Sequence, residues 1–180
     1  MLFYRKYFGP QQKYCVQVSD VPGVVRLLDY VETRDSYYIV METQTRSIDL
    51  FDFISAAGTL PEDVAREIFG QVSCDWRRPG QYSPLIGRQV VEAVLRCRDL
   101  HVLHGDVKDE NILMDLDTGT ARLIDFGSGS WAPASSASSA SPALYTEYEG
   151  TRVYAPPEWL LHRQYSGEDW WHTVIITITT

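Results

Sequence analysis

The sequence predicts an α+β fold with one hydrophobic core. Three observations support this prediction. The 180 residues are 44% hydrophobic, which is enough for a single core. Ala121–Ile124 is a short strand-like run. Pro61–Gln71 has helical spacing, with Val64, Ile68 and Phe69 on one face.

The N-terminal segment, residues 1–20, matches no recognised pattern and is left unassigned. It contains Lys6 and Lys13, neither in an informative context, and Gly9-Pro10, which indicates only a turn. Met1–Lys6 lacks a long apolar run, so we expect no signal peptide.

The predicted helix begins at Pro61, with Thr59 as a candidate cap, and its pattern stops after Gln71. The next eighteen residues, Val72–Gln89, contain two prolines and two glycines, which disfavour a helix. If they were removed, Gln71 would join Val90 and the helical face would resume. We interpret residues 72–89 as an insertion encoded by a translated intron. A genuine surface loop is the alternative.

A compact polar run, His104–Asn111, indicates a catalytic loop. It places a carboxylate at Asp106, an ammonium at Lys108 and an amide at Asn111. In phosphoryl transfer, a carboxylate accepts the proton of the attacking hydroxyl, while metal and Lys neutralise phosphate charge. Mg²⁺ takes oxygen ligands, which suits an Asn amide. Asp106, Lys108 and Asn111 are therefore the predicted catalytic residues, and Asn111 is also a predicted metal ligand.

Two further motifs follow in order. Asp125-Phe126-Gly127 lies fourteen residues after Asn111 and supplies a second predicted Mg²⁺ ligand, Asp125. Gly150–Glu158 carries an Ala-Pro-Glu pattern with one extra proline. Together with the catalytic loop, these are the ordered motifs of a protein kinase.

Beyond these motifs, the chain resembles the Pim family of serine/threonine kinases over residues 22–71 and 90–167. The stretches that carry the resemblance are Val24–Tyr30, Asp49–Ile54, Lys108–Leu113 and Leu123–Gly129. The resemblance implies a protein-kinase-like fold, mainly the hinge and the helical C-lobe, truncated at both ends. Residues 21–167 would form this partial domain, with no Gly-rich loop and no Lys-bearing strand recognisable before it.

The resemblance also implies ATP and Mg²⁺ as cofactors and protein Ser/Thr residues as acceptors. It places Glu42 in the hinge, where its backbone carbonyl would accept from adenine, and Asp49 near the ribose. It further implies that Asp49, Asp52 and Glu110 favour basic residues upstream of the phosphorylated residue. Each of these carboxylates could instead be ordinary solvated surface.

Gly105 departs from the family pattern, which has Arg inside the catalytic loop. That Arg pairs with a phosphate on the activation loop and so acts as a switch. We therefore expect activity that does not need this phosphorylation and that is reduced. We also expect that restoring Arg at position 105 increases phosphotransfer.

Two segments lack the pattern of a packed core. Residues 128–143 include a Ser/Ala-rich run that cannot bury enough apolar surface to order itself. We interpret it as an insertion in the activation segment, either merely tolerated or regulatory. Residues 168–180 are an unassigned β-branched tail with strand propensity, too short for a membrane span.

Composition limits the partners. The net charge of −8 argues against nucleic acid and anionic membrane, and it fits protein substrates with basic motifs. Three cysteines without metal-ligand spacing indicate reduced thiols. The predicted location is therefore the cytoplasm, with the nucleus as a further location, and the oligomeric state is open.

We predict a serine/threonine protein kinase that transfers the γ-phosphate of ATP. The alternative is a catalytically inactive kinase fragment or a pseudokinase-like binding module, because the loop and Lys that hold the phosphates are not recognisable. A third interpretation, a Ser-rich scaffold unrelated to kinases, requires the three ordered motifs to be coincidental.

Overall fold

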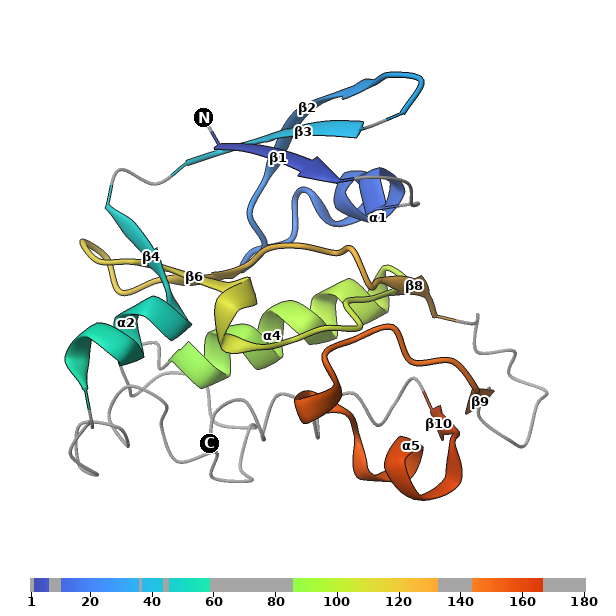
Figure 1. The fold of residues 1–180 in the computed structure, drawn as a ribbon. Coiled ribbons are helices and arrows are strands. Elements are labelled where there is room, and N and C mark those ends of the chain that lie inside the picture. The colour runs from blue at the N-terminus through green and yellow to red at the C-terminus, as the bar shows by residue number, and fades with distance from the viewer. Residues whose placement is uncertain are drawn as a thin grey trace.

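A computed structural model of the chain describes residues 2–6, 11–35, 37–43, 46–58, 86–132 and 144–166 (Figure 1). It contains helices together with small, mainly antiparallel sheets, which confirms the α+β prediction. Figure 1 shows a small sheet with one helix at the top and a larger, more helical part below. We call these parts the N-terminal layer and the C-terminal layer.

The N-terminal layer is a three-stranded sheet in the order β1-β3-β2, packed with α1 (Gln11–Val18). The antiparallel strands are β1 (Leu2–Lys6), β2 (Leu27–Glu32) and β3 (Tyr37–Met41). In β3, Ile39 and Met41 are buried, as the two-residue strand period predicts. Tyr14, Cys15 and Val18 of α1 join the same core. Much of the unassigned segment 1–20 therefore belongs to this layer.

The C-terminal layer is built around α4 (Ile86–Asp99) and a three-stranded sheet. The sheet has the order β4-β6-β7, and a second pair of strands is formed by β5 and β8. The strands are β4 (Ser47–Asp49), β5 (Val102–Leu103), β6 (Ile112–Asp115), β7 (Ala121–Leu123) and β8 (Ser130–Trp131). One face of α4 is buried against β5 and β7 at helical spacing.

Residues 86–89, which the insertion hypothesis included, lie within α4. The Gln89 side chain accepts from the Ala121 backbone N–H at 2.8 Å and donates to the Gly119 carbonyl at 3.3 Å. Because eighteen residues make about five helical turns, residues 86–89 have the phase that residues 68–71 would have. Residues 59–85 lie outside the described residues, so both the predicted helix at 61–71 and the insertion at 72–85 remain predictions.

Helix α2 (Leu50–Ala57) begins at an acidic cap. The Asp49 carboxylate accepts from the Asp52 backbone N–H at 2.8 Å, in the usual N-cap geometry. The side chain predicted to lie near a ribose therefore has a structural role at the start of α2.

Replacing Asp49 with Ala should lower the free energy of unfolding by about 1 kcal/mol, because an orphan N–H of α2 loses its acceptor. Asp49→Ser should retain most of the stability, since a hydroxyl can also cap. Urea denaturation of both variants measures the difference. Equal destabilisation by Ser and Ala would contradict the capping role.

The segment from 144 to 166 folds back on itself beneath the catalytic loop (Figure 1). Its ends pair as two short strands, β9 (Leu144–Tyr145) and β10 (Tyr165–Ser166), and the rings of Tyr145 and Tyr165 stack at 5.3 Å. Between them lie η2 (Arg152–Tyr154) and α5 (Pro157–His162). Of the predicted Ser/Ala-rich insertion, residues 128–132 belong to the fold through β8, while residues 133–143 and the tail from 167 lie outside the described residues.

The two layers meet where the loop after α1 reaches β7. Val24 forms a parallel bridge with Leu123. Gly23, at φ +91°, lies so close to α4 that an added Cβ would be 2.7 Å from the Ala93 Cβ. Only glycine fits this approach without displacement.

Cys15 and Cys97 are buried, and burial raises the pKa of Cys97 to about 12. The third cysteine, Cys74, lies outside the described residues. Within the described helices, none is both long and apolar enough to cross a bilayer.

Candidate active site

The catalytic loop starts at His104. This side chain is buried and contacts both the loop and the Asp-Phe-Gly motif. The Asp106 backbone N–H donates to His104 Nδ1 at 3.2 Å, so Nδ1 must be an unprotonated acceptor. Nε2 therefore carries the proton and donates to the Ile124 carbonyl at 2.9 Å. The ring also packs on Phe126, with centroids 4.6 Å apart. His104 thus joins the loop to the Asp-Phe-Gly motif as a neutral imidazole.

Burial lowers the pKa of His104 below its usual 6.5, an effect only partly offset by the Ile124 carbonyl and nearby carboxylates. Below pH 6.5, the unfolded chain binds a proton that the folded chain excludes. The stability contributed by neutral His104 is complete above pH 6.5 and should fall with decreasing pH, by at most about 1.4 kcal/mol per pH unit.

Urea denaturation between pH 7.5 and 5 tests this dependence. The variant His104→Phe should lose part of the slope of unfolding free energy against pH. An identical slope in the wild type and in His104→Phe would contradict the assignment of this pH dependence to His104.

Four polar residues meet at the centre of the loop. Asn111, which is 6% exposed, donates to the Asp106 carbonyl at 2.8 Å and to its carboxylate at 3.3 Å. The Lys108 ammonium lies 3.4 Å from the same carboxylate. The structure therefore brings together all three predicted catalytic residues. The Asp106 carboxylate is thus held between the Asn111 amide and the Lys108 ammonium.

Thr151 is the fourth member, and the sequence prediction did not include it among the site residues. Its backbone N–H donates to Asp106 Oδ1 at 2.7 Å, and its hydroxyl accepts from Lys108 Nζ at 3.0 Å. The only sequence signal was its place in the Gly150–Glu158 motif. Through Thr151, the segment 144–166 contacts both the predicted base and the predicted phosphate-binding Lys.

Gly105 has a steric role that the sequence did not suggest. Its φ is +79°, and an added Cβ would lie 2.1 Å from the Ser128 carbonyl oxygen. A Cβ on Gly150 would lie 2.4 Å from the Gly105 carbonyl oxygen. The two glycines let three backbone segments pack together. The expectation that Arg at position 105 would increase phosphotransfer is therefore revised, because its Cβ would collide with backbone.

A cavity of about 170 Å³ lies beside this cluster, between the two layers. Both predicted metal ligands, Asn111 and Asp125, border it, as does Glu110. Asp125 has a φ of +61° and accepts from the Gly127 N–H at 3.0 Å. The other lining residues are mostly apolar: Cys15, Val24, Val25, Ile39, Met41, Leu123, Ile124 and Phe126.

The cavity suits part of a metal–nucleotide complex, and we call it the nucleotide cavity. An Asn amide and a carboxylate are suitable ligands for Mg²⁺, and apolar walls suit a purine ring. Its lining, in the part of the chain that the structure describes, includes no Lys or Arg. The same described residues hold no group of three His, Cys, Asp or Glu side chains able to bind a metal.

Of the remaining predicted residues, Glu110 borders this cavity, whereas Glu42, Asp49 and Asp52 are not among the described residues that line it. The Glu42 side chain faces a second cavity behind the chain that leaves β3, so only its backbone carbonyl could serve the predicted adenine contact. Asp49 and the exposed Asp52 lie at the start of α2, which contacts the short helix η1 (Asp109–Asn111). Glu110 lies on η1, with its carboxylate 4.0 Å from Lys108 Nζ. Burial raises the pKa of Glu110, and hydrogen bonding to Asp109 adds to the effect.

Comparison with known proteins finds similarity to protein kinases at the level of both a family model and individual sequences. Residues 80–180 match the family model of the protein kinase domain. The chain is 40% identical over 151 residues to the serine/threonine-protein kinase prk-2 of Caenorhabditis elegans, covering 84% of this chain and 28% of that protein. It is also 40% identical over 144 residues to the serine/threonine-protein kinase pim-2 of Danio rerio, covering 79% and 38%. The chain thus spans about a third of the length of these relatives.

A solved structure has the same fold. The Cydia pomonella granulovirus kinase PK-1 aligns with a TM-score of 0.65 and 21% sequence identity. The alignment covers 98% of this chain and 58% of the viral kinase. This similarity confirms the kinase-like part of the fold prediction, for a chain that spans only part of the fold.

Proposed function

Because the chain belongs to the protein kinase domain family, we propose that it takes part in transfer of the ATP γ-phosphate to Ser or Thr residues of proteins. The observation that carries this proposal is the contact of Asp106 with Lys108, Asn111 and Thr151 beside the cavity bordered by Asp125. Phosphoryl transfer depends mainly on such positioning and on charge stabilisation.

Each residue has a separate role in the proposed mechanism. The Asp106 carboxylate accepts the proton of the substrate hydroxyl as that oxygen attacks the γ-phosphorus of ATP. The bond between the γ-phosphorus and the bridging oxygen to the β-phosphate breaks, and ADP leaves. Lys108 neutralises charge on the transferring phosphate, and Thr151 keeps Lys108 in place. Asn111 and Asp125 would hold Mg²⁺, which neutralises charge on the phosphate oxygens when it is bound.

The finer assignment within the family is also a proposal. Identity of 40% to pim-2 and the sequence stretches around the site support a Pim-like kinase. Preference for basic substrates is supported by the net charge of −8 and by the placement of Asp49 and Asp52 on an element that contacts η1, where Glu110 lies. We propose the cytoplasm as the location, with the nucleus as a further location, and residues 21–167 as the kinase-like part.

A second function is favoured by one specific observation. Among the described residues that line the nucleotide cavity, none is a Lys or Arg that could bind the phosphates. On this second function, the chain binds nucleotide weakly and acts as a binding module without phosphotransfer.

Two measurements on the purified chain separate these functions. Mg-ATP should raise the melting temperature if the cavity binds nucleotide, because binding to the folded state stabilises it. Asp125→Asn should reduce that shift. Phosphotransfer is then measured on a Ser peptide with upstream Arg residues and on a matched peptide with Ala in their place. Transfer that prefers the Arg peptide supports the kinase; a thermal shift without transfer supports the binding module; no shift contradicts both.

A further inference from the structure

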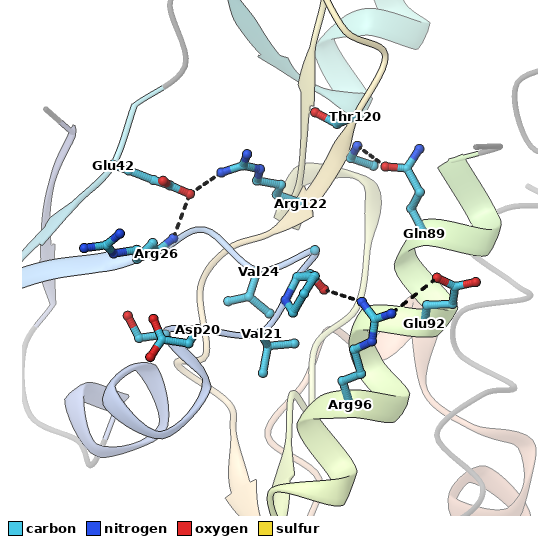
Figure 2. Close-up of a pocket in the computed structure, with 14 residues that line it drawn as sticks. Asp20, Val21, Val24, Arg26, Glu42, Gln89, Glu92, Arg96, Thr120 and Arg122 are labelled. Atoms are coloured by element: carbon cyan, nitrogen blue, oxygen red, sulfur yellow. Dashed lines mark hydrogen bonds and ion pairs between the residues drawn. The ribbon is translucent and has the colours of Figure 1, made fainter. Parts of the chain in front are cut away.

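A second cavity, of about 410 Å³, lies behind the chain segment that joins the two layers (Figure 2). Four parts of the fold line it: the loop from Ser19 to Arg26, Glu42 after β3, helix α4 and strand β7. It lies on the other side of Val24 from the nucleotide cavity, since Val24 lines both. Val24 is therefore part of both cavity walls.

Glu42 connects the segment before β2 with strand β7 in the wall of this cavity. Its carboxylate accepts from the Arg122 guanidinium and, at 3.1 Å, from the Arg26 backbone N–H (Figure 2). Its own backbone N–H donates to the Arg26 carbonyl at 3.0 Å. Glu42 is thus fixed to the start of β2 by backbone contacts and to β7 by its charge.

Arg122 lies on the strand that leads into the proposed metal ligand. The next residue, Leu123, donates to the Gly23 carbonyl at 2.8 Å and accepts from the Val25 N–H at 2.9 Å. Ile124 then donates to the Asn111 carbonyl at 3.0 Å, one residue before Asp125. The ion pair thus lies next to the backbone bonds that join the layers.

The pair is better shielded than the surface pairs Arg46–Asp117, Arg88–Glu92 and Arg98–Asp99, although less so than Lys108–Asp106 in the catalytic loop. The side chains of Glu42 and Arg122 are 31% and 33% exposed, whereas those of the Arg46–Asp117 pair are 51% exposed or more. Partial shielding reduces screening by water and salt, so the contribution of the Glu42–Arg122 pair should exceed that of a surface pair.

We propose that Glu42 and Arg122 are positioning residues that hold the segment after β3 against β7. They thereby fix the spacing of the two walls of the nucleotide cavity, with Ile39 and Met41 on one side and Leu123–Phe126 on the other. The effect on nucleotide affinity rests on the proposed function. The effect on the junction of the layers does not.

Hydrogen–deuterium exchange of the nucleotide-free chain tests the junction directly. The Val25 and Leu123 amides are protected by the bonds between the layers, so loss of the ion pair should make them exchange faster. Glu42→Gln and Arg122→Gln should each raise these rates roughly threefold, which corresponds to an ion pair of about 0.6 kcal/mol. Arg122→Lys keeps the charge and should restore most of the protection. The double variant should show no more than the larger single effect.

The matched control is Arg46→Gln, which removes the exposed pair with Asp117 and should leave both amides unchanged. Unchanged exchange in Glu42→Gln and Arg122→Gln would overturn the proposal, and so would equal effects of Arg122→Lys and Arg122→Gln. Titration with Mg-ATP is the second readout, and its dissociation constant should rise by a similar factor in the two Gln variants. If the wild type binds no nucleotide while exchange still responds, the proposed function fails and the positioning role stands.

Discussion

Replacing Gly105 with Ala should lower the free energy of unfolding by about 2–5 kcal/mol. A residue with a Cβ at positive φ costs about 1–2 kcal/mol, and crowding against packed backbone adds about 1–3 kcal/mol. Here the new Cβ would lie 2.1 Å from the Ser128 carbonyl oxygen, which belongs to backbone and cannot rotate away. Urea denaturation of the purified variant measures the loss.

Gly119→Ala is the matched control. Gly119 also has a positive φ, +68°, but an added Cβ would meet nothing within 4 Å. The free energy of unfolding of this variant should therefore fall only by the cost of a positive φ, about 1 kcal/mol. Equal losses at positions 105 and 119 would contradict the close packing around Gly105.

Gly105→Arg should lower the free energy of unfolding at least as much as Gly105→Ala does. Displacement of Ser128 would also disturb the contact of its hydroxyl with the Glu149 carbonyl, at 3.1 Å, two residues before Thr151. We therefore expect phosphotransfer to fall in Gly105→Arg. A variant with higher phosphotransfer and unchanged stability would restore the sequence-based expectation and overturn the structural one.

Replacing Asp106 with Asn should reduce kcat for phosphotransfer by about 10²–10⁴-fold. The amide keeps the size of the side chain but cannot accept the hydroxyl proton, and general bases contribute on this scale. Asp106 Oδ1 could still accept from the Thr151 N–H as an amide oxygen, which limits the structural damage. The thermal shift with Mg-ATP should therefore persist while turnover is lost.

Steady-state phosphotransfer with the Arg-containing peptide measures this effect. Asp117→Asn is a suitable control, because Asp117 is an exposed carboxylate in the turn between β6 and β7. Retention of kcat within about tenfold in Asp106→Asn would remove Asp106 from the role of base. A large loss in Asp117→Asn would show that the assay reports general charge effects.

Much of the site could be predicted because its chemistry is local in sequence. Asp106, Lys108 and Asn111 lie within six residues of each other, so their spacing alone indicated a common loop. Their contacts in the structure agree with this grouping. Thr151 could not be placed in the same way, because it reaches Asp106 across 45 positions of the chain.

The N-terminal layer shows why part of the fold was missed. The segment 1–20 lacked a familiar motif, yet β1 pairs along β3 and α1 buries Tyr14 and Val18. Strand pairing uses backbone groups that every sequence has, so it leaves little trace in composition. Likewise, the helical phase could not decide whether residues 86–89 belong to α4, since eighteen residues make about five whole turns.

The sequence by itself determined membership of the protein kinase domain family, the ordered motifs and the residue types of the proposed chemistry, because these depend on spacing along one segment. Only the tertiary structure decided how distant segments meet. It decided that Gly105 is required by close backbone packing, that Asp49 caps a helix and that Glu42 pairs with Arg122. Such contacts depend on distances between residues far apart in the chain, and those distances are set by the packing of the whole core.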